Sequence, residues 1–302
     1  MLEKRDPTDS IMFITDPNAV LIEVSEILSR MGMATLITGM TSIFRDVQKM
    51  FKGEFGAFKP SNTPYHDIDH TLSVFLATAR IAHGAQVNGA GLGESEMLRA
   101  LIASLLHDSG YLQTVDDAEG TGAKYGAKHE LRSVANVHEY LATKGLPQAA
   151  VNDCEIMVAL TKLSIVPSQL KFRTPGIERA ARIVATADLI AQVADRLYLE
   201  KLLLLYKESV DSGKPMYASE QDLIEKTDHF YHTVVKKRVR DDLGDVAKHL
   251  AAHFKNRWDL DRDLYQYNIK KNIDYLKRVI VDGGGNYRDH LKRGGIVEKL
   301  TE

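Results

Sequence analysis

The chain has 302 residues, of which 44% are hydrophobic and 26% are charged, as is typical of a globular protein with a substantial core. Its 39 basic and 41 acidic side chains give a formal net charge of −2, which argues against general binding of nucleic acid but allows a small phosphorylated substrate. The single cysteine, Cys154, excludes an intrachain disulfide, and without an apolar run of about 18 residues or of signal-peptide length we expect a cytoplasmic protein with no membrane partner.

Apolar residues recur at helical spacing over nearly the whole sequence, which predicts an all-α protein. Most of the 8 prolines stand between the predicted helices or at their starts. Ser10 to Thr15 is a candidate for a short strand. The predicted helices cover residues 17–31, 34–52, 64–83, 94–108, 127–144, 147–163, 176–210, 219–255 and 258–281.

We divide the chain into three parts that together form one compact unit. Residues 1–60 form helices that pack on a core made by residues 61–200. Residues 201–302 form a C-terminal helical extension, whose charged helices could also supply a homodimer surface. A glycine-rich tail around residues 283–285 leads to a short final helix, and Cys154 is expected in the core.

The predicted helix 64–83 is apolar on two sides, which is typical of a helix enclosed by other elements. One of these sides also contains His66 and His70. If Thr63 caps the helix and Pro64 is its first residue, the two histidines lie one turn apart. His83, His138 and the C-terminal histidines are instead expected to be ordinary helix residues.

His107 and Asp108 follow directly after an apolar helical run and precede the helix-stopping Gly110. A buried carboxylate is costly unless a cation or hydrogen-bond donors lie beside it. Asp188 is a second carboxylate that is expected to be buried, because its helical neighbours are mostly alanine and valine. Its expected partner is either an arginine or a metal. Together with His70, these residues form a nitrogen and oxygen donor set suited to a divalent metal.

These residues, in this order, resemble the H…HD…D signature of the HD-domain superfamily of metal-dependent phosphohydrolases. His70 precedes His107 by 37 residues, and Asp108 precedes Asp188 by 80. The resemblance covers roughly residues 60–200 and implies an HD-domain helical bundle. It implies that His70, His107, Asp108 and Asp188 are the primary metal ligands.

Two further segments extend the resemblance. Residues 65–70, Tyr-His-Asp-Ile-Asp-His, are similar to the Tyr-His-Asn-x-x-His opening of class I cyclic-nucleotide phosphodiesterases, which implies that His66 donates a proton to the leaving group. Tyr111 and Ser73 stand where those enzymes have a histidine and an aspartate, so this similarity is distant. Residues 128–133 resemble the His-Glu-x-x-Ser motif of small bacterial HD phosphohydrolases, which implies that His129 contributes to a second metal or to a bound phosphate.

We therefore expect a metal-dependent hydrolase of a phosphodiester or nucleotide-like phosphate, which uses water activated by one or two divalent ions (Mn, Mg, Fe, Zn, Co or Ni). The glycine-rich loop 115–128 either closes over the phosphate through Lys124 or Lys128 or is a flexible surface loop. Two other functions stay open: a di-iron HD-type oxygenase, and a non-catalytic signalling module that binds a metal or a nucleotide.

Overall fold

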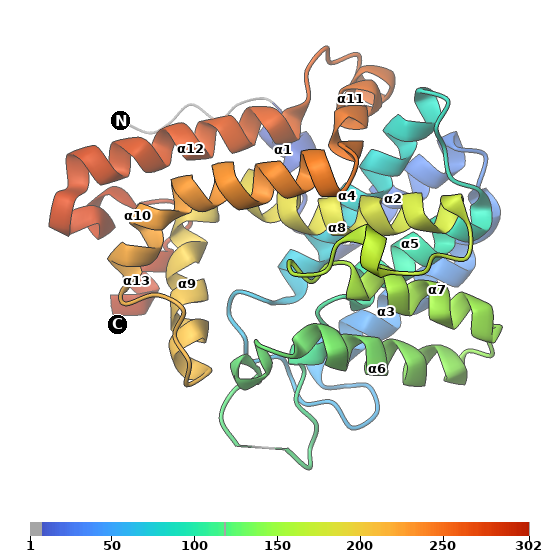
Figure 1. Cartoon of the computed structure of the whole chain (residues 1–302), viewed down its shortest axis with the longest axis horizontal. Helices are drawn as coiled ribbons and strands as arrows, with labels where there is room; N and C mark the ends of the chain where they lie inside the picture. Colours follow the sequence, from blue (N-terminus) through green and yellow to red (C-terminus); the bar gives the residue numbers. More distant parts are fainter. Residues whose placement is uncertain (1–7, 118, 302) are drawn as a thin grey trace.

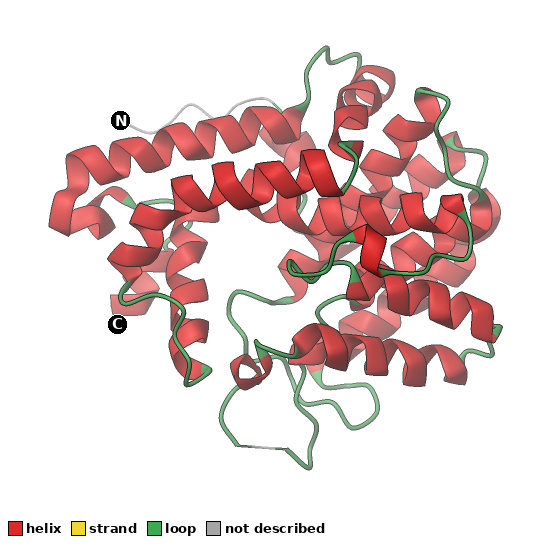
Figure 2. Cartoon of the chain, in the orientation of Figure 1, coloured by secondary structure: helices red, strands yellow, loops and turns green. Residues whose placement is uncertain are grey.

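The computed structural model describes residues 8–117 and 119–301, and Figure 2 shows that these residues form helices joined by loops. This part of the chain contains no strand, only an isolated antiparallel bridge between Phe58 and Thr114, so the all-α prediction is confirmed. None of its helices is long and apolar enough to cross a membrane. The α-helices are α1 (Asp9–Met12), α2 (Pro17–Arg30), α3 (Ile37–Lys52), α4 (Ile68–Val87), α5 (Glu94–Leu106), α6 (His129–Thr143), α7 (Gln148–Ala159), α8 (Pro175–Ala194), α9 (Tyr198–Asp211), α10 (Glu220–Phe230), α11 (Leu250–Trp258), α12 (Leu264–Gly283) and α13 (Ile296–Thr301) (Figure 1).

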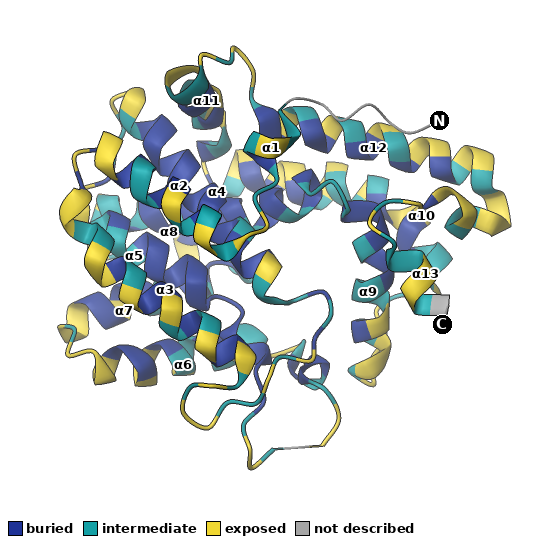
Figure 3. Cartoon of the chain, turned by 180° about the vertical axis from the view of Figure 1, so that it is seen from behind, coloured by how far each residue is buried: buried dark blue, intermediate teal, exposed yellow. Residues whose placement is uncertain are grey.

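Helix α4 occupies the interior and packs against α2, α5, α8 and α11. Every residue from Val74 to Ala85 is buried, as the two apolar sides of this segment predict (Figure 3). Gly84 allows α11 to come close, because a Cβ at this position would lie only 2.0 Å from the carbonyl oxygen of His249. This enclosed helix holds one wall of the candidate site in a fixed position.

The start of α4 differs from the prediction. The helix begins at Ile68, where the Asp67 side chain is the N-cap and accepts a hydrogen bond from the backbone N–H of His70 at 2.9 Å. Thr63 does not cap it, because its hydroxyl instead donates to the carbonyl of His66 at 2.8 Å. The expectation of a helix beginning at Pro64 is therefore wrong, and His66 lies in the turn before the helix.

The predicted helix 176–210 is two helices, α8 and α9, separated by a short break. At this break Asp195 accepts a hydrogen bond from the backbone N–H of Leu197 at 2.9 Å, and its second oxygen pairs with Lys201 at 2.5 Å. These contacts stabilise a change of chain direction that periodicity alone does not indicate. As a result α9 turns back toward the segment that contains His66.

Three other predicted elements are also corrected. Ser10 to Thr15 is not a strand, since α1 occupies Asp9–Met12 and its last carbonyls accept hydrogen bonds from Arg80. The predicted helix 219–255 is interrupted near Asp245, which has the left-handed φ of 52°, and α11 follows this interruption. Helix α12 starts at Leu264, later than the predicted residue 258, where Asp263 provides the N-cap.

The C-terminal helices pack on the rest of the chain and share its core. The side-chain amide of Asn272 in α12 donates to the carbonyls of Val193 and Asp195 at 2.8 and 2.7 Å, which joins α12 to the end of α8. Buried apolar residues form one continuous cluster from Met12 to Leu291. Figure 1 shows α9, α10, α12 and α13 together at one end of the molecule, and α13 is the expected short final helix.

A second buried polar cluster lies between α4 and α11, away from the candidate site. His83 and His253 are almost fully buried, and their Nδ1 atoms lie 2.9 Å apart. Arg80 is also buried, and its guanidinium carbon lies 5.6 Å from the centre of the Phe254 ring. The expectation that His83 and the C-terminal histidines are ordinary helix residues overlooks this pair.

Candidate metal centre

Three elements bring the four residues of the H…HD…D pattern together. His70 lies in the first turn of α4, His107 is the C-cap of α5 with Asp108 directly after it, and Asp188 lies on α8. The Nε2 atoms of His70 and His107 are 3.3 Å apart. Oδ2 of Asp108 lies 3.4 Å from the first of these nitrogens and 3.2 Å from the second. Oδ1 of Asp188 lies 3.3 and 3.6 Å from the same two atoms.

Two imidazole nitrogens and two carboxylate oxygens face one another in this group. Nδ1 of His107 is 2.9 Å from the carbonyl of Ser104 and donates to it, so the neutral ring presents a lone pair on Nε2. Oδ2 of Asp108 is buried and has no hydrogen-bond donor among the described residues. Positive charge, either a proton on an imidazole or a metal ion, stabilises converging acceptors of this kind. His70, His107 and Asp108, whose ligand atoms lie within 4.8 Å of one another, could hold a metal ion.

The charges of the group influence its protonation. Burial by itself lowers the pKa of His107, but the carboxylates of Asp108 and Asp188 outweigh burial and raise this pKa well above its ordinary value. Burial by itself raises the pKa of Asp108, but the neighbouring histidines, His107 first, lower it well below its ordinary value. The site is thus arranged to hold positive charge between ionised carboxylates, as a proton or as a metal ion.

His129 lies beside the other oxygen of Asp108. Its Nδ1 is 2.8 Å from the carbonyl of Gly126, and its Nε2 is 3.7 Å from Oδ1 of Asp108. Gly110 permits this position, since a Cβ there would lie 2.0 Å from the carbonyl oxygen of His129. The N–H of Gly110 also donates to the hydroxyl of Ser133 at 2.8 Å. His129 therefore lies at the edge of the group, on the Oδ1 side of Asp108.

His66 reaches the same site from the turn before α4 and is held by Glu208 of α9. Nδ1 of His66 is 2.6 Å from Oε2 of Glu208, and Oε1 of the same carboxylate accepts from the backbone N–H groups of Tyr65 and His66 at 2.5 and 3.1 Å. Burial by itself lowers the pKa of His66, but the Glu208 carboxylate outweighs burial and raises it. The rings of His66 and His70 are direct neighbours in an edge-on arrangement, with their centres 6.0 Å apart.

Glu208 was not predicted from the sequence, because a glutamate in a heavily charged helix usually faces solvent. In the sequence, Tyr111 stands out only as a departure from the phosphodiesterase pattern. In the structure its ring stacks on His66, with the ring centres 4.2 Å apart, and on His129, with the centres 4.4 Å apart. Tyr65 is a further neighbour, and its hydroxyl donates to Gln192 at 2.7 Å.

The loop 115–128 is folded against the site in the part that the structure describes. Lys124 pairs with the carboxylate of Asp117 and donates to the carbonyl of Glu119 at 2.6 Å. The guanidinium of Arg132 lies 3.6 Å from the centre of the Tyr125 ring. Lys124 is thus engaged within the loop in this arrangement.

Comparisons with known proteins assign no family. The chain matches no protein-family model, and no curated protein matches it. The structure itself shows an all-α protein with a buried cluster of histidine and aspartate that could hold a metal.

Proposed function

We propose that the chain is a metal-dependent hydrolase of phosphate esters of the HD-domain type. The observation that supports this proposal is the convergence of His70, His107, Asp108 and Asp188 on one point, with Oδ2 of Asp108 left without a hydrogen-bond donor among the described residues. A nitrogen and oxygen donor set without thiolate fits the divalent ions that assist phosphate-ester hydrolysis.

In this proposal His70, His107, Asp108 and Asp188 would hold the ion. His66 would donate a proton to the leaving group. A divalent ion, when bound, lowers the pKa of water and polarises a phosphoryl oxygen. Because Nδ1 of His66 is held by Glu208, its other ring nitrogen is free to donate a proton to the departing oxygen. The raised pKa of His66 keeps this proton available near neutral pH. His129 would contribute to a second ion on the far oxygen of Asp108.

The same arrangement supports a proposal for the substrate class. General-acid help is most useful when the leaving group is an alkoxide, which is a poor leaving group without a proton. We therefore propose a phosphodiester or a nucleotide-like phosphate monoester as the substrate. Protonation by His66 would occur as the bond between phosphorus and the ester oxygen breaks.

The experiment that tests this proposal combines elemental analysis of the purified protein with turnover of bis(4-nitrophenyl) phosphate, 4-nitrophenyl phosphate and cyclic nucleotides in Mn, Mg, Fe, Co, Ni and Zn. We expect bound metal and metal-dependent release of the alcohol, and loss of both in Asp108→Asn. Asp69→Asn is the matched control, because Asp69 is exposed one residue before His70. Full activity in Asp108→Asn would contradict the mechanism. Bound iron with an oxygen-dependent product would instead favour the oxygenase, and metal binding without turnover would favour a binding module.

A further inference from the structure

A buried pair of histidines joins α4 to α11 at the end of α4 that is remote from the candidate metal centre. Nδ1 of His83 lies 2.9 Å from Nδ1 of His253, so one ring donates the shared hydrogen and the other ring accepts it in its neutral form. Nε2 of His253 is buried and has no hydrogen-bond partner among the described residues. His83 and His70 are 13 positions apart in α4, which corresponds to about 20 Å along the helix.

The charges that other residues bring to this pair are positive. They come from Arg80 of α4, Arg30 of α2 and Arg257 of α11. Arg80 is fully buried and donates a hydrogen bond to the hydroxyl of Tyr265 in α12 at 3.2 Å. Within the described residues no carboxylate pairs with either histidine. A proton taken up by the pair would therefore be a buried charge without a compensating anion, which is costly.

The remaining charged groups of the surrounding elements act elsewhere. Both oxygens of Glu23 in α2 accept from Arg257, at 3.3 and 3.2 Å. Lys248, Arg179 and Asp245 act on the exposed His249 and not on the pair. The other ionic and capping contacts here are Arg30 with Glu26 at 2.8 Å, Lys255 with Asp259 at 2.7 Å, and Asp263 with the backbone N–H groups of Tyr265 and Gln266 at 2.9 and 3.1 Å.

The segment 246–258, which contains α11, is bounded on both sides by residues with a left-handed backbone. Asp245 has a φ of 52° and Asp259 a φ of 54°, and no other described residue except glycine has a positive φ. This conformation is unfavourable for a residue with a side chain and persists where the surrounding packing imposes it. The packing is tight, since a Cβ on Gly84 would lie 2.0 Å from the carbonyl oxygen of His249. Separation of the segment from α4 would release the strain at both of its ends.

We infer that the segment 246–258 is an acid-sensitive switch, which separates from α4 when the pair of His83 and His253 becomes protonated. A first proton places an uncompensated charge beside Arg80. A second proton leaves two N–H groups facing each other, so the hydrogen bond between the rings is lost. In the open state water solvates both rings, and the tight packing offers no other way to admit it.

The direction of the pH dependence follows from the closed state. Burial, followed by the neighbouring cations, lowers the pKa of His83 and lowers that of His253 well below its ordinary value. The open state therefore binds protons first as the pH falls below about 6.5, and opening becomes easier. Asp263 acts in the opposite sense, because burial raises its pKa to about 6 and its protonation favours the closed state.

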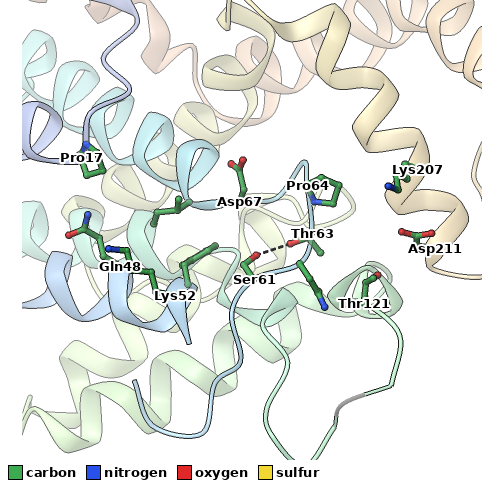
Figure 4. Close-up of a pocket in the computed structure, with 13 residues that line it drawn as sticks. Pro17, Gln48, Lys52, Ser61, Thr63, Pro64, Asp67, Thr121, Lys207 and Asp211 are labelled. Atoms are coloured by element: carbon green, nitrogen blue, oxygen red, sulfur yellow. Dashed lines mark hydrogen bonds between the residues drawn. The ribbon is translucent and has the colours of Figure 1, made fainter. Parts of the chain in front are cut away.

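The candidate metal centre does not have to change when the segment opens. Figure 4 shows Asp67, the N-cap of α4, beside an open cavity of about 590 Å³, and His70 follows in the first turn of the helix. Helices α2, α5 and α8 also pack on α4 and would still hold it. The switch does not require that the protein binds a metal or hydrolyses a phosphate ester.

The test is hydrogen exchange of the full-length protein, measured by mass spectrometry at pH 7.5 and 5.5 and corrected for the effect of pH on the intrinsic exchange rate. Peptides from 246–258 are compared with peptides from α5 and α8. The decisive variant is His83→Gln/His253→Gln, and His232→Gln, at an exposed position, is its matched control. Acrylamide quenching of Trp258, the only tryptophan of the chain, reports on the same segment, because its ring centre lies 5.3 Å from that of His253.

We expect the protection of 246–258 to fall about tenfold to a hundredfold between pH 7.5 and 5.5 in the wild type and in His232→Gln, since one or two histidines bind protons in the open state. The protection of α5 and α8 should fall less than about threefold, and quenching of Trp258 should increase. In the double histidine variant the loss should be absent, whereas Asp263→Asn should retain it.

Three results would overturn the inference. They are unchanged protection of 246–258 at pH 5.5, an equal loss of protection in all helices, and an undiminished loss in the double histidine variant. Absence of the loss in Asp263→Asn would assign the pH dependence to that carboxyl and overturn it as well. If the double variant does not fold, the comparison between 246–258 and the other helices of the wild type decides by itself.

Discussion

Nδ1 of His66 lies 2.6 Å from Oε2 of Glu208, although the two residues are 142 positions apart in the chain. The contact joins the turn before α4 to α9, in the C-terminal third of the chain. Since the same carboxylate also accepts from two backbone N–H groups of this turn, Glu208 fixes both the backbone and the ring of His66. A helix outside the H…HD…D pattern thus positions the expected general acid.

We predict that Glu208→Gln lowers kcat about 10- to 100-fold without changing the metal content. Loss of the negative charge lowers the pKa of His66, so the protonated form becomes scarce at a lower pH than in the wild type. The high-pH limb of the kcat profile should therefore shift to lower pH. Because both residues serve one proton transfer, adding Glu208→Gln to His66→Asn should have little further effect. An unshifted pH profile would show that Glu208 only supports the fold.

Metal binding should stabilise the folded chain through the converging ligands. At free metal of about 100 times its Kd, the gain in the free energy of unfolding is about 2.7 kcal/mol, since the unfolded chain lacks a formed site. We expect a higher Tm with Mn or Zn, and reversal of this increase by a chelator. Differential scanning fluorimetry of Asp108→Asn should show no such response, whereas Asp69→Asn should respond like the wild type. An equal increase in all three proteins would mean that the metal binds elsewhere.

We expect the ring of Tyr111, and not its hydroxyl, to contribute to stability and to activity. Its stacks on His66 and His129 are each worth about 0.5–1.5 kcal/mol beyond the buried area. We predict that Tyr111→Ala loses stability and at least tenfold in kcat/KM, because two expected site residues lose their support, whereas Tyr111→Phe stays within a few-fold of the wild type. Steady-state kinetics and urea unfolding of both variants decide this. Equal losses in both would assign the effect to the hydroxyl.

Gly110→Ala should disturb the packing of Gly110 against the start of α6, which contains His129. The added Cβ would lie 2.0 Å from the carbonyl oxygen of His129, a contact that forces α6 to move and costs about 1–3 kcal/mol. Gly39→Ala is the matched control, since Gly39 is exposed in α3 with nothing within 4 Å of a Cβ, and there alanine should stabilise by about 0.5–1 kcal/mol. Denaturant unfolding and metal affinity measure the two effects. A Gly110→Ala protein as stable as the wild type, with unchanged metal affinity, would contradict the close packing.

The buried histidine pair should make the protein sensitive to acid. Burial, Arg80, His83 and Arg257 all lower the pKa of His253 below that of the unfolded chain, which is about 6.5. The unfolded state therefore binds the proton first as the pH falls, and the free energy of unfolding decreases by up to about 1.4 kcal/mol per pH unit below pH 6.5. His253→Gln cannot be protonated and should show a smaller decrease between pH 7.5 and 5.5, measured by urea unfolding. His232→Gln, at an exposed position, should match the wild type, and identical slopes in all three proteins would exclude the pair as the cause.

Local signals in the sequence predict much of this fold. The apolar run and Gly110 close behind it predict a helix that ends at residue 108, and α5 ends two residues earlier, at Leu106. The burial of α4 follows from its two apolar sides. The helix boundaries that were wrong depend on single hydrogen bonds, such as the choice between Thr63 and Asp67 as the cap, which periodicity does not distinguish.

The residues of the candidate site also include some that the sequence reveals and others that it does not. Histidine and aspartate residues in an apolar context stand out in the sequence, because an unpartnered charge there is costly. Glu208 does not stand out, since its role depends on where α9 turns after the break at Asp195. The stack of Tyr111 between two histidines also depends on distant packing, and no spacing rule reveals it.

The position of Glu208 constrains how this site can pass between proteins. A gene segment that encodes residues 61–200 specifies every expected metal ligand, yet it omits the carboxylate that contacts Nδ1 of His66. Recombination with a breakpoint between residues 200 and 208 would transfer the expected metal ligands and His66 without Glu208. For the proposed function, the segment that must be inherited together therefore extends beyond residue 200 to Glu208 in α9.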